Sequence, residues 1–113
     1  MIVRRNQMNV DEKVDLRGGT GTLYFTRLAP PETFRHAKTI AEVRMPPDCS
    51  IGFHKHEDET EFYIILSGSG VANDNGKEFP IKAGDVMITG NGSSHGLKNT
   101  GKKDLVYQAI VLS

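Results

Sequence analysis

One stretch of this 113-residue chain does most to indicate its fold, and it reads His54-Lys55-His56-Glu57-Asp58-Glu59-Thr60-Glu61, followed directly by Phe62-Tyr63-Ile64-Ile65-Leu66. Side chains alternate between the two faces of an extended strand, so His54 and His56 should point to the same face. Glu61 opens a β-branched and aromatic run with apolar neighbours, where an unpaired carboxylate would be costly to bury. These three side chains therefore predict a shared metal ion.

A third imidazole follows at His95, after the glycine-rich turn Gly90-Asn91-Gly92-Ser93-Ser94. Neutral imidazole suits Mn, Fe, Co, Ni, Cu or Zn, and one carboxylate shifts the preference towards harder divalent ions. We therefore predict a divalent transition metal, of undetermined identity, held by His54, His56, Glu61 and His95. On an octahedral ion these ligands leave two positions open, whereas a closed tetrahedral zinc site would be structural.

Length and charge limit the classes of protein to which the chain could belong. At 113 residues with 37% apolar composition it is long enough for one domain and too short for two. Its 14 basic and 14 acidic residues cancel, so no nucleic-acid or membrane partner is expected. No signal peptide or membrane span is evident, and we expect a cytoplasmic protein. Cys49 is the only cysteine, which excludes an intrachain disulfide and a thiolate zinc cluster.

Short extended segments separated by Gly, Pro and Asn turns predict an all-β sandwich or barrel without a substantial helix. The strongest hairpin signal is Asn75-Gly76 between two strand-like segments. We expect both faces of the strand at 61–67 to be buried. Other strands are expected at residues 22–28, 34–45, 50–56 and 105–112.

The chain divides into an N-terminal arm, residues 1–21, and a barrel domain, residues 22–113. The arm is expected to be a flexible segment or a turn into the barrel, and it could add to the barrel or to a dimer interface. The acidic turn Glu57-Asp58-Glu59 is expected to be solvated and to give the pocket mouth a negative charge.

Two sequence motifs can be matched residue by residue. The first, two histidines one residue apart followed by a glutamate and a glycine, is matched by His54, His56, Glu61 and Gly68. The second is matched by Gly84, Gly92, His95 and Asn99. On these motifs the chain resembles the cupin superfamily, over roughly residues 22–112. It departs from the motifs in two turns, where Asp48 replaces a glycine and Gly90 replaces a proline.

The resemblance implies a jelly-roll β-barrel, also called a double-stranded β-helix, with a metal near its centre and often a homodimer. It does not fix the reaction, because this superfamily hosts many chemistries on one barrel. Oxalate-degrading cupins carry an arginine three residues before the first motif histidine, where this chain has Ile51. This counts against oxalate-degrading chemistry, although not against binding a small dicarboxylate.

Two functional hypotheses follow. The first is a metalloenzyme of dioxygenase, isomerase or decarboxylase type that acts on a small oxygen-rich substrate at the open metal positions. The second is a non-catalytic binding or sensing protein in which the metal is structural. Candidate catalytic residues are Tyr63 and Arg44, and a substrate carboxylate could be bound by Arg27, Arg35 or Arg44.

Overall fold

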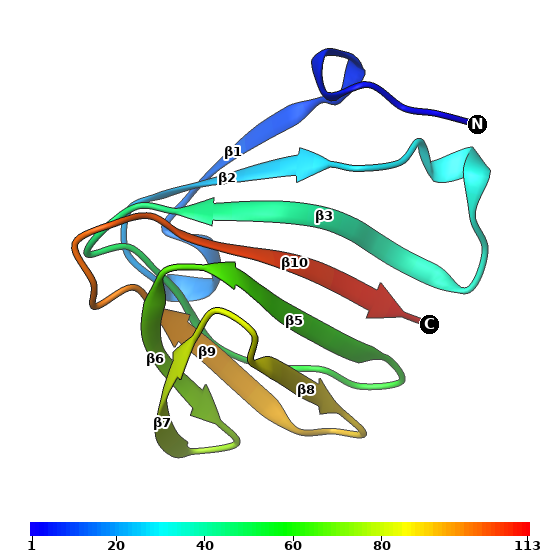
Figure 1. Ribbon diagram of the computed structural model, residues 1–113. Helices are drawn as coiled ribbons and strands as arrows, with labels where there is room; N and C mark the ends of the chain where they lie inside the picture. The colour runs from blue at the N-terminus through cyan, green and yellow to red at the C-terminus, as the bar shows by residue number, and fades with distance from the viewer.

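The computed structural model describes residues 1–113 and contains ten strands in two antiparallel sheets (Figure 1). The strand order is β1-β2-β3-β10-β5-β8 in the larger sheet and β4-β9-β6-β7 in the smaller one. The strands are β1 (Val10–Val14), β2 (Thr22–Arg27), β3 (Ala37–Met45), β4 (Ser50–Lys55), β5 (Thr60–Ser67), β6 (Ser69–Asp74), β7 (Lys77–Lys82), β8 (Val86–Gly90), β9 (Ser94–Lys98) and β10 (Leu105–Leu112). The predicted all-β jelly roll is confirmed.

Helical structure is limited to three single 3-10 turns, η1 (Arg5–Gln7), η2 (Leu16–Gly18) and η3 (Pro31–Thr33). The chain has no helix with the length and apolar character that crossing a membrane requires.

Local turn chemistry explains where the strands reverse. Asn75 and Gly76 both have positive φ, 52° and 99°, which is the left-handed geometry of a two-residue hairpin turn between β6 and β7. Asp48, which replaces the motif glycine, has a φ of 67° in the turn before β4. Aspartate tolerates this conformation better than most residues, so the replacement leaves the turn intact.

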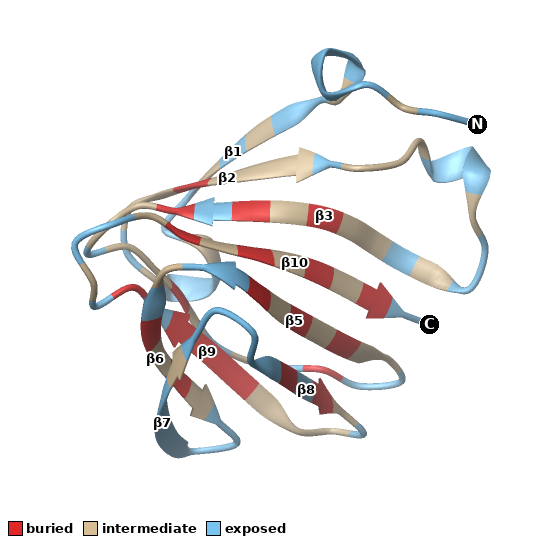
Figure 2. Ribbon diagram, in the orientation of Figure 1, coloured by how far each residue is buried: buried red, intermediate tan, exposed pale blue.

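The core lies between the two sheets and is centred on β10, which pairs with β3 on one side and β5 on the other. Alternate side chains of β10 point inward and are buried, in keeping with the two-residue period of a strand. They pack with inward residues of the neighbouring strands, which appear as red bands on β3, β10 and β5 in Figure 2. The inward residues of β10 are Leu105, Tyr107, Ala109 and Val111.

The expectation that both faces of β5 are buried is wrong. Glu61, Tyr63 and Ile65 are buried on the inner face, but Leu66 on the other face is 44% exposed. The outer side chains Phe62 and Ile64 are half-buried. The reason is that the outer face of the larger sheet has no covering layer in the monomer, which its apolar sequence did not reveal.

Part of the N-terminal segment pairs with the larger sheet. Strand β1 pairs with β2 at the edge of the larger sheet, and Arg27 Nε donates to Asp11 Oδ2 at 2.8 Å. Turn η2 then crosses to β4, where Thr20 and Ser50 exchange backbone hydrogen bonds of 3.2 and 2.9 Å. The chain at residues 15–21 therefore lies against the strand that carries the first motif histidine.

Candidate metal centre

Both sheets contribute to the predicted metal site. His54 lies on β4 and His95 on β9, where the two residues are direct partners in the antiparallel register. A β-bulge between Ile51 and His54 breaks that register just before the histidine, and bulges commonly redirect a side chain in this way. His56 follows β4 directly, and Glu61 projects from β5 of the larger sheet.

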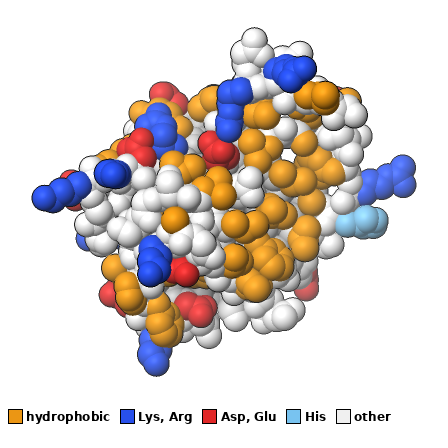
Figure 3. Space-filling model, in the orientation of Figure 1, with side chains coloured by type: hydrophobic (Ala, Val, Ile, Leu, Met, Phe, Trp, Pro, Cys, Tyr) orange, Lys and Arg blue, Asp and Glu red, His pale blue; other side chains and the backbone are white.

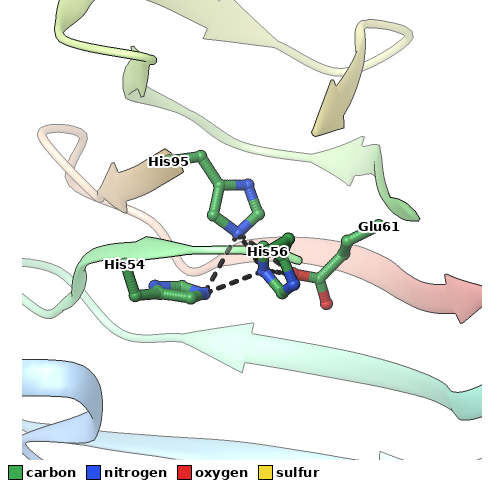
Figure 4. A group of neighbouring side chains, drawn as sticks. All are labelled: His54, His56, Glu61 and His95. Atoms are coloured by element: carbon green, nitrogen blue, oxygen red, sulfur yellow. Dashed lines mark hydrogen bonds and ion pairs between the residues drawn. The ribbon is translucent and has the colours of Figure 1, made fainter. Parts of the chain in front are cut away.

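The four predicted ligands converge on one point between the sheets (Figure 4). The Nε2 atoms of the three histidines lie 3.0 to 3.1 Å from one another. Glu61 Oε1 lies 2.9 Å from His56 Nε2 and 3.0 Å from His95 Nε2. His56, Glu61 and His95 are at most 7% exposed, so these polar atoms meet in a region that is largely closed to water.

These separations fit a metal ion in a particular geometry. Two ligand atoms at right angles on an ion with bonds of about 2.1 Å lie about 3.0 Å apart, whereas tetrahedral ligands lie about 3.4 Å apart. The observed spacings of 2.9 to 3.1 Å therefore match neighbouring octahedral positions better than tetrahedral ones.

The hydrogen bonds of the imidazoles also fit a metal. His54 Nδ1–H donates to the Gly52 carbonyl at 2.7 Å, and His56 Nδ1–H donates to Glu59 Oε1 at 2.7 Å. In the neutral rings these bonds leave a lone pair on each Nε2. Lone pairs and a carboxylate oxygen at such short separations repel one another unless a cation lies between them. The residues present therefore suit a divalent ion.

Electrostatics favour the neutral form of the first ligand. Burial lowers the pKa of His54 below its ordinary value of 6.5, and the nearby His95 and His56 rings act in the same direction. The hydrogen bond to the Gly52 carbonyl opposes this shift only in part. A neutral imidazole is the form that binds metals, so His54 is ready to act as a ligand at neutral pH.

The expectation that Glu59 is solvated is wrong. Its side chain is 17% exposed and bridges His56 to Lys38, whose Nζ lies 2.8 Å from Glu59 Oε2. The hydrogen bond from Lys38 holds the pKa of Glu59 below its ordinary value, with a smaller effect from His56. Its neighbours Glu57 and Asp58 are exposed, as expected. Glu59 thus fixes the ring of His56, a predicted ligand, as carboxylates beside metal-binding histidines commonly do.

A cavity of about 300 Å³ opens onto three of the four predicted ligands, His54, His56 and Glu61. Four basic residues and two carboxylates line this cavity. The expectation that its mouth carries a negative charge is therefore wrong. The basic residues are Lys13, Arg17, Arg27 and Lys38. Three of these, Lys13, Arg17 and Lys38, were missed, because they lie outside the motifs. Nothing in the local sequence of the arm indicates that Lys13 and Arg17 reach the cavity.

The candidates for catalysis and for carboxylate binding are only partly brought to the cavity. Arg44 lies outside it, on the outer face, with its guanidinium 4.2 Å from the centre of the Tyr24 ring and 3.3 Å from Asp104. Arg35 is exposed before β3, also away from the cavity. Arg27 lines the cavity but is paired with Asp11. Side chains alternate between the two faces of β3, and the neighbours Val43 and Met45 point into the core. Arg44 therefore points outward.

Tyr63 lines the cavity and stacks on His95, with ring centres 4.6 Å apart. Burial raises the pKa of Tyr63 well above its ordinary value, and the nearby Tyr107 and Glu61 reinforce the shift. The phenol therefore stays protonated at neutral pH. It can donate a hydrogen bond in the cavity, but it cannot serve there as a general base.

Asn99, the last residue of the second motif, has a structural role. Its side chain is fully buried, and Nδ2 donates to the carbonyls of Met45 and Lys103 at 2.9 and 2.8 Å. Oδ1 accepts from the Gly101 backbone N–H at 2.9 Å. The amide thereby connects the end of β3 to the loop between β9 and β10.

Comparison with known proteins places these features in context. Residues 41–112 match the Cupin domain family. A Thermotoga maritima protein named oxalate-binding protein is 42% identical over 113 residues, which is 99% of this chain and 93% of that protein.

Solved structures agree on the fold. The crystal structure of a predicted oxalate decarboxylase from Thermotoga maritima is 42% identical with a TM-score of 0.94, and the match covers 99% of this chain and 98% of that one. The polyketide cyclase RemF from Streptomyces resistomycificus is 20% identical with a TM-score of 0.78, over 99% of this chain and 78% of that one. At that identity the second likeness concerns the fold alone.

Proposed function

Because this chain belongs to the cupin family, we propose that it binds a small dicarboxylate of the oxalate class at a divalent transition metal ion held by His54, His56, Glu61 and His95. The observation that carries the proposal is the convergence of three imidazole Nε2 atoms and one carboxylate oxygen on a single point. The oxalate-binding name of the Thermotoga maritima relative supports the choice of ligand.

The spacing of the ligands supports a chelating ligand in particular. Glu61 Oε1 neighbours His56 and His95, and all four ligand atoms lie within 4.8 Å of one another. These four side chains would hold an octahedral ion with two positions left open. A bound divalent ion would supply a Lewis-acidic centre there for the two oxygens of a chelating dicarboxylate.

The cavity favours binding over degradation of such a ligand. Ile51 lines it at the position where oxalate-degrading cupins carry an arginine. The titratable groups that remain are poorly suited to proton transfer, because Glu59 is paired with Lys38 and His56, and Tyr63 stays protonated. Neither Glu59 nor Tyr63 is therefore free to act as a general base.

A metalloenzyme of dioxygenase, isomerase or decarboxylase type is the second candidate. The related Thermotoga maritima structure described as a predicted oxalate decarboxylase favours it. Incubating metal-loaded protein with oxalate and following carbon dioxide, formate and oxygen uptake separates the two candidates. Binding of oxalate without any product supports the binding-protein candidate. Turnover of oxalate that is lost in His95→Ala supports the metalloenzyme candidate.

The metal part of the proposal is tested by elemental analysis of protein purified without a nickel resin. Near-stoichiometric transition metal is expected, with loss in His54→Ala, His56→Ala, Glu61→Gln and His95→Ala. His36→Ala is the matched control, because His36 is exposed and lies outside the cluster. Metal content that is equally low in all proteins, or equally high, would contradict the assignment of the four ligands.

A homodimer formed through the outer face of the larger sheet is part of the same proposal. Ile110 pairs with Ile40 on one side and Phe62 on the other, and Phe62 pairs with Ile88, which gives an apolar row across four strands. Hydrophobic side chains gather over this part of the sheet in Figure 3. Ile88 is 57% exposed, and such surfaces commonly mark protein interfaces. Light scattering should give twice the chain mass, and Ile88→Glu should give the monomer.

A further inference from the structure

Arg17 reaches the cavity of the metal site from the N-terminal segment rather than from either motif. It lies in η2, with a φ of 55°, and lines the cavity together with His54 and Tyr63. His54 lies on β4 and Tyr63 on β5, so this part of the cavity lining spans both sheets. Arg17 therefore lies close to the space between the sheets where a metal-bound ligand would sit.

The other basic residues of the cavity already have partners. Arg27 Nε donates to Asp11 at 2.8 Å, and Lys38 Nζ donates to Glu59 at 2.8 Å. Lys13 Nζ lies 5.4 Å from the centre of the Phe25 ring. Arg17 has neither an ion pair nor a side-chain hydrogen bond, although its guanidinium offers five N–H donors. It is thus the arginine of the cavity that is free to bind an anion.

Close backbone packing fixes the position of Arg17 relative to the metal ligands. A Cβ atom built on Gly52 would collide with the Arg17 carbonyl oxygen, and one built on Gly19 would collide with the Ser50 carbonyl oxygen. Only glycine at both positions lets η2 approach β4 so closely. Gly52 also accepts the hydrogen bond of His54 Nδ1, so one short piece of backbone positions both the first metal ligand and Arg17.

We infer that Arg17 binds the carboxylate oxygens of the ligand that are not bound to the metal, and that the site thereby selects dicarboxylates over monocarboxylates. This inference rests on the proposed function and names a specificity-determining residue for it.

The chemistry of the ligand explains the need for such a residue. A chelated dicarboxylate uses one oxygen of each carboxylate, and the two remaining oxygens still carry negative charge. Leaving them without donors in a cavity is costly, whereas a guanidinium fork matches a pair of carboxylate oxygens. A monocarboxylate such as formate brings half the charge and gains less from the same guanidinium.

The test is calorimetric titration of oxalate and of formate into Mn²⁺-reconstituted protein, with metal content measured on each sample. Arg17→Gln should weaken oxalate binding about ten- to hundredfold while metal content stays unchanged. Formate binding should change much less. Arg17→Lys restores the charge without the guanidinium fork. Its affinity for oxalate should lie between the affinities of Arg17→Gln and of the unmodified protein. Arg35→Gln removes the same charge from an exposed site outside the cavity and should bind oxalate as the unmodified protein does.

The outcomes separate this inference from the proposed function. If the unmodified protein binds oxalate and Arg17→Gln binds it equally well, the inference is wrong and the proposed function stands. An equal loss of oxalate and formate binding, or a loss of metal, would make Arg17 a structural residue and overturn the selectivity. If the Mn²⁺-loaded protein does not bind oxalate at all, the proposed function fails and the inference fails with it.

Discussion

His54 and His95 face each other across the β4–β9 pair, and their Nε2 atoms lie 3.1 Å apart. The two residues are 41 positions apart in the sequence. Their meeting depends on the register of the smaller sheet, and a slip by one residue would turn one of the rings to the opposite face. The register of a single strand pair therefore positions half of the predicted metal ligands.

Removing Glu59 should weaken metal binding although Glu59 is not itself a ligand. Its carboxylate accepts the hydrogen bond of His56 Nδ1, and losing such a partner commonly lowers metal affinity about ten- to hundredfold. Glu59→Ala should show this loss in a competition titration with a chromogenic chelator. Glu57→Ala is the matched control, because Glu57 lies on the same turn but pairs with Lys55 on the surface. Equal affinity in the two variants would contradict the role of Glu59.

The stability of the metal-free protein should fall as the pH is lowered through the range just below 6.5. The pKa of His54 is depressed in the folded state, so the unfolded chain takes up this proton first. The contribution of neutral His54 to the free energy of unfolding is fully present above pH 6.5. It is lost as the pH falls towards the pKa of His54 in the folded state. Thermal midpoints measured from pH 8 to pH 5 should therefore decline less steeply in His54→Gln, and identical slopes would argue against the depressed pKa.

Asn99→Ala should destabilise the fold without altering the metal site. The substitution leaves the Met45 carbonyl in the interior without its donor and removes two further hydrogen bonds. We expect the free energy of unfolding in urea to fall by about 2 kcal/mol or more. Asn73→Ala, which removes one exposed hydrogen bond to Gly76, should cost about 0.5–1 kcal/mol. A loss of metal from folded Asn99→Ala protein would show that the residue does more than support the fold.

Removing the metal should lower thermal stability, because an ion that binds only the folded state stabilises it. At a thousandfold excess of metal over its dissociation constant, this contribution is about 4 kcal/mol. The thermal midpoint of the purified protein should fall on dialysis against a chelator and recover on addition of the ion. His95→Ala should show no such response, and a response equal to that of the unmodified protein would place the ion elsewhere.

Much of the fold, and the cluster of three histidines and one glutamate, could be predicted from the sequence. The Asn75-Gly76 turn and the alternating residues of 105–112 specify local structure directly, and the structure has β10 at Leu105–Leu112. The four predicted ligands could be named because their spacing is local to two motifs, and the structure brings them within 4.8 Å of one another.

What could not be predicted depends on contacts between distant segments. Arg17 reaches the cavity through close packing of two glycines on separate segments, Gly19 and Gly52, and neither neighbourhood indicates the other. Glu59 resembles its exposed neighbours in sequence, and only the three-dimensional position of Lys38 and His56 distinguishes it. The outer face of β5 is as apolar as a buried one, so sequence alone could not show that it lacks a covering layer.

The proposed function requires that the metal ion held by His54, His56, Glu61 and His95 binds a small dicarboxylate. Calorimetric titration of oxalate into matched metal-loaded and metal-free samples measures this binding. We predict one oxalate per metal ion in the loaded protein and no binding in the metal-free protein. Equal binding in both samples, or none in the fully loaded protein, would show that oxalate does not bind at this metal ion.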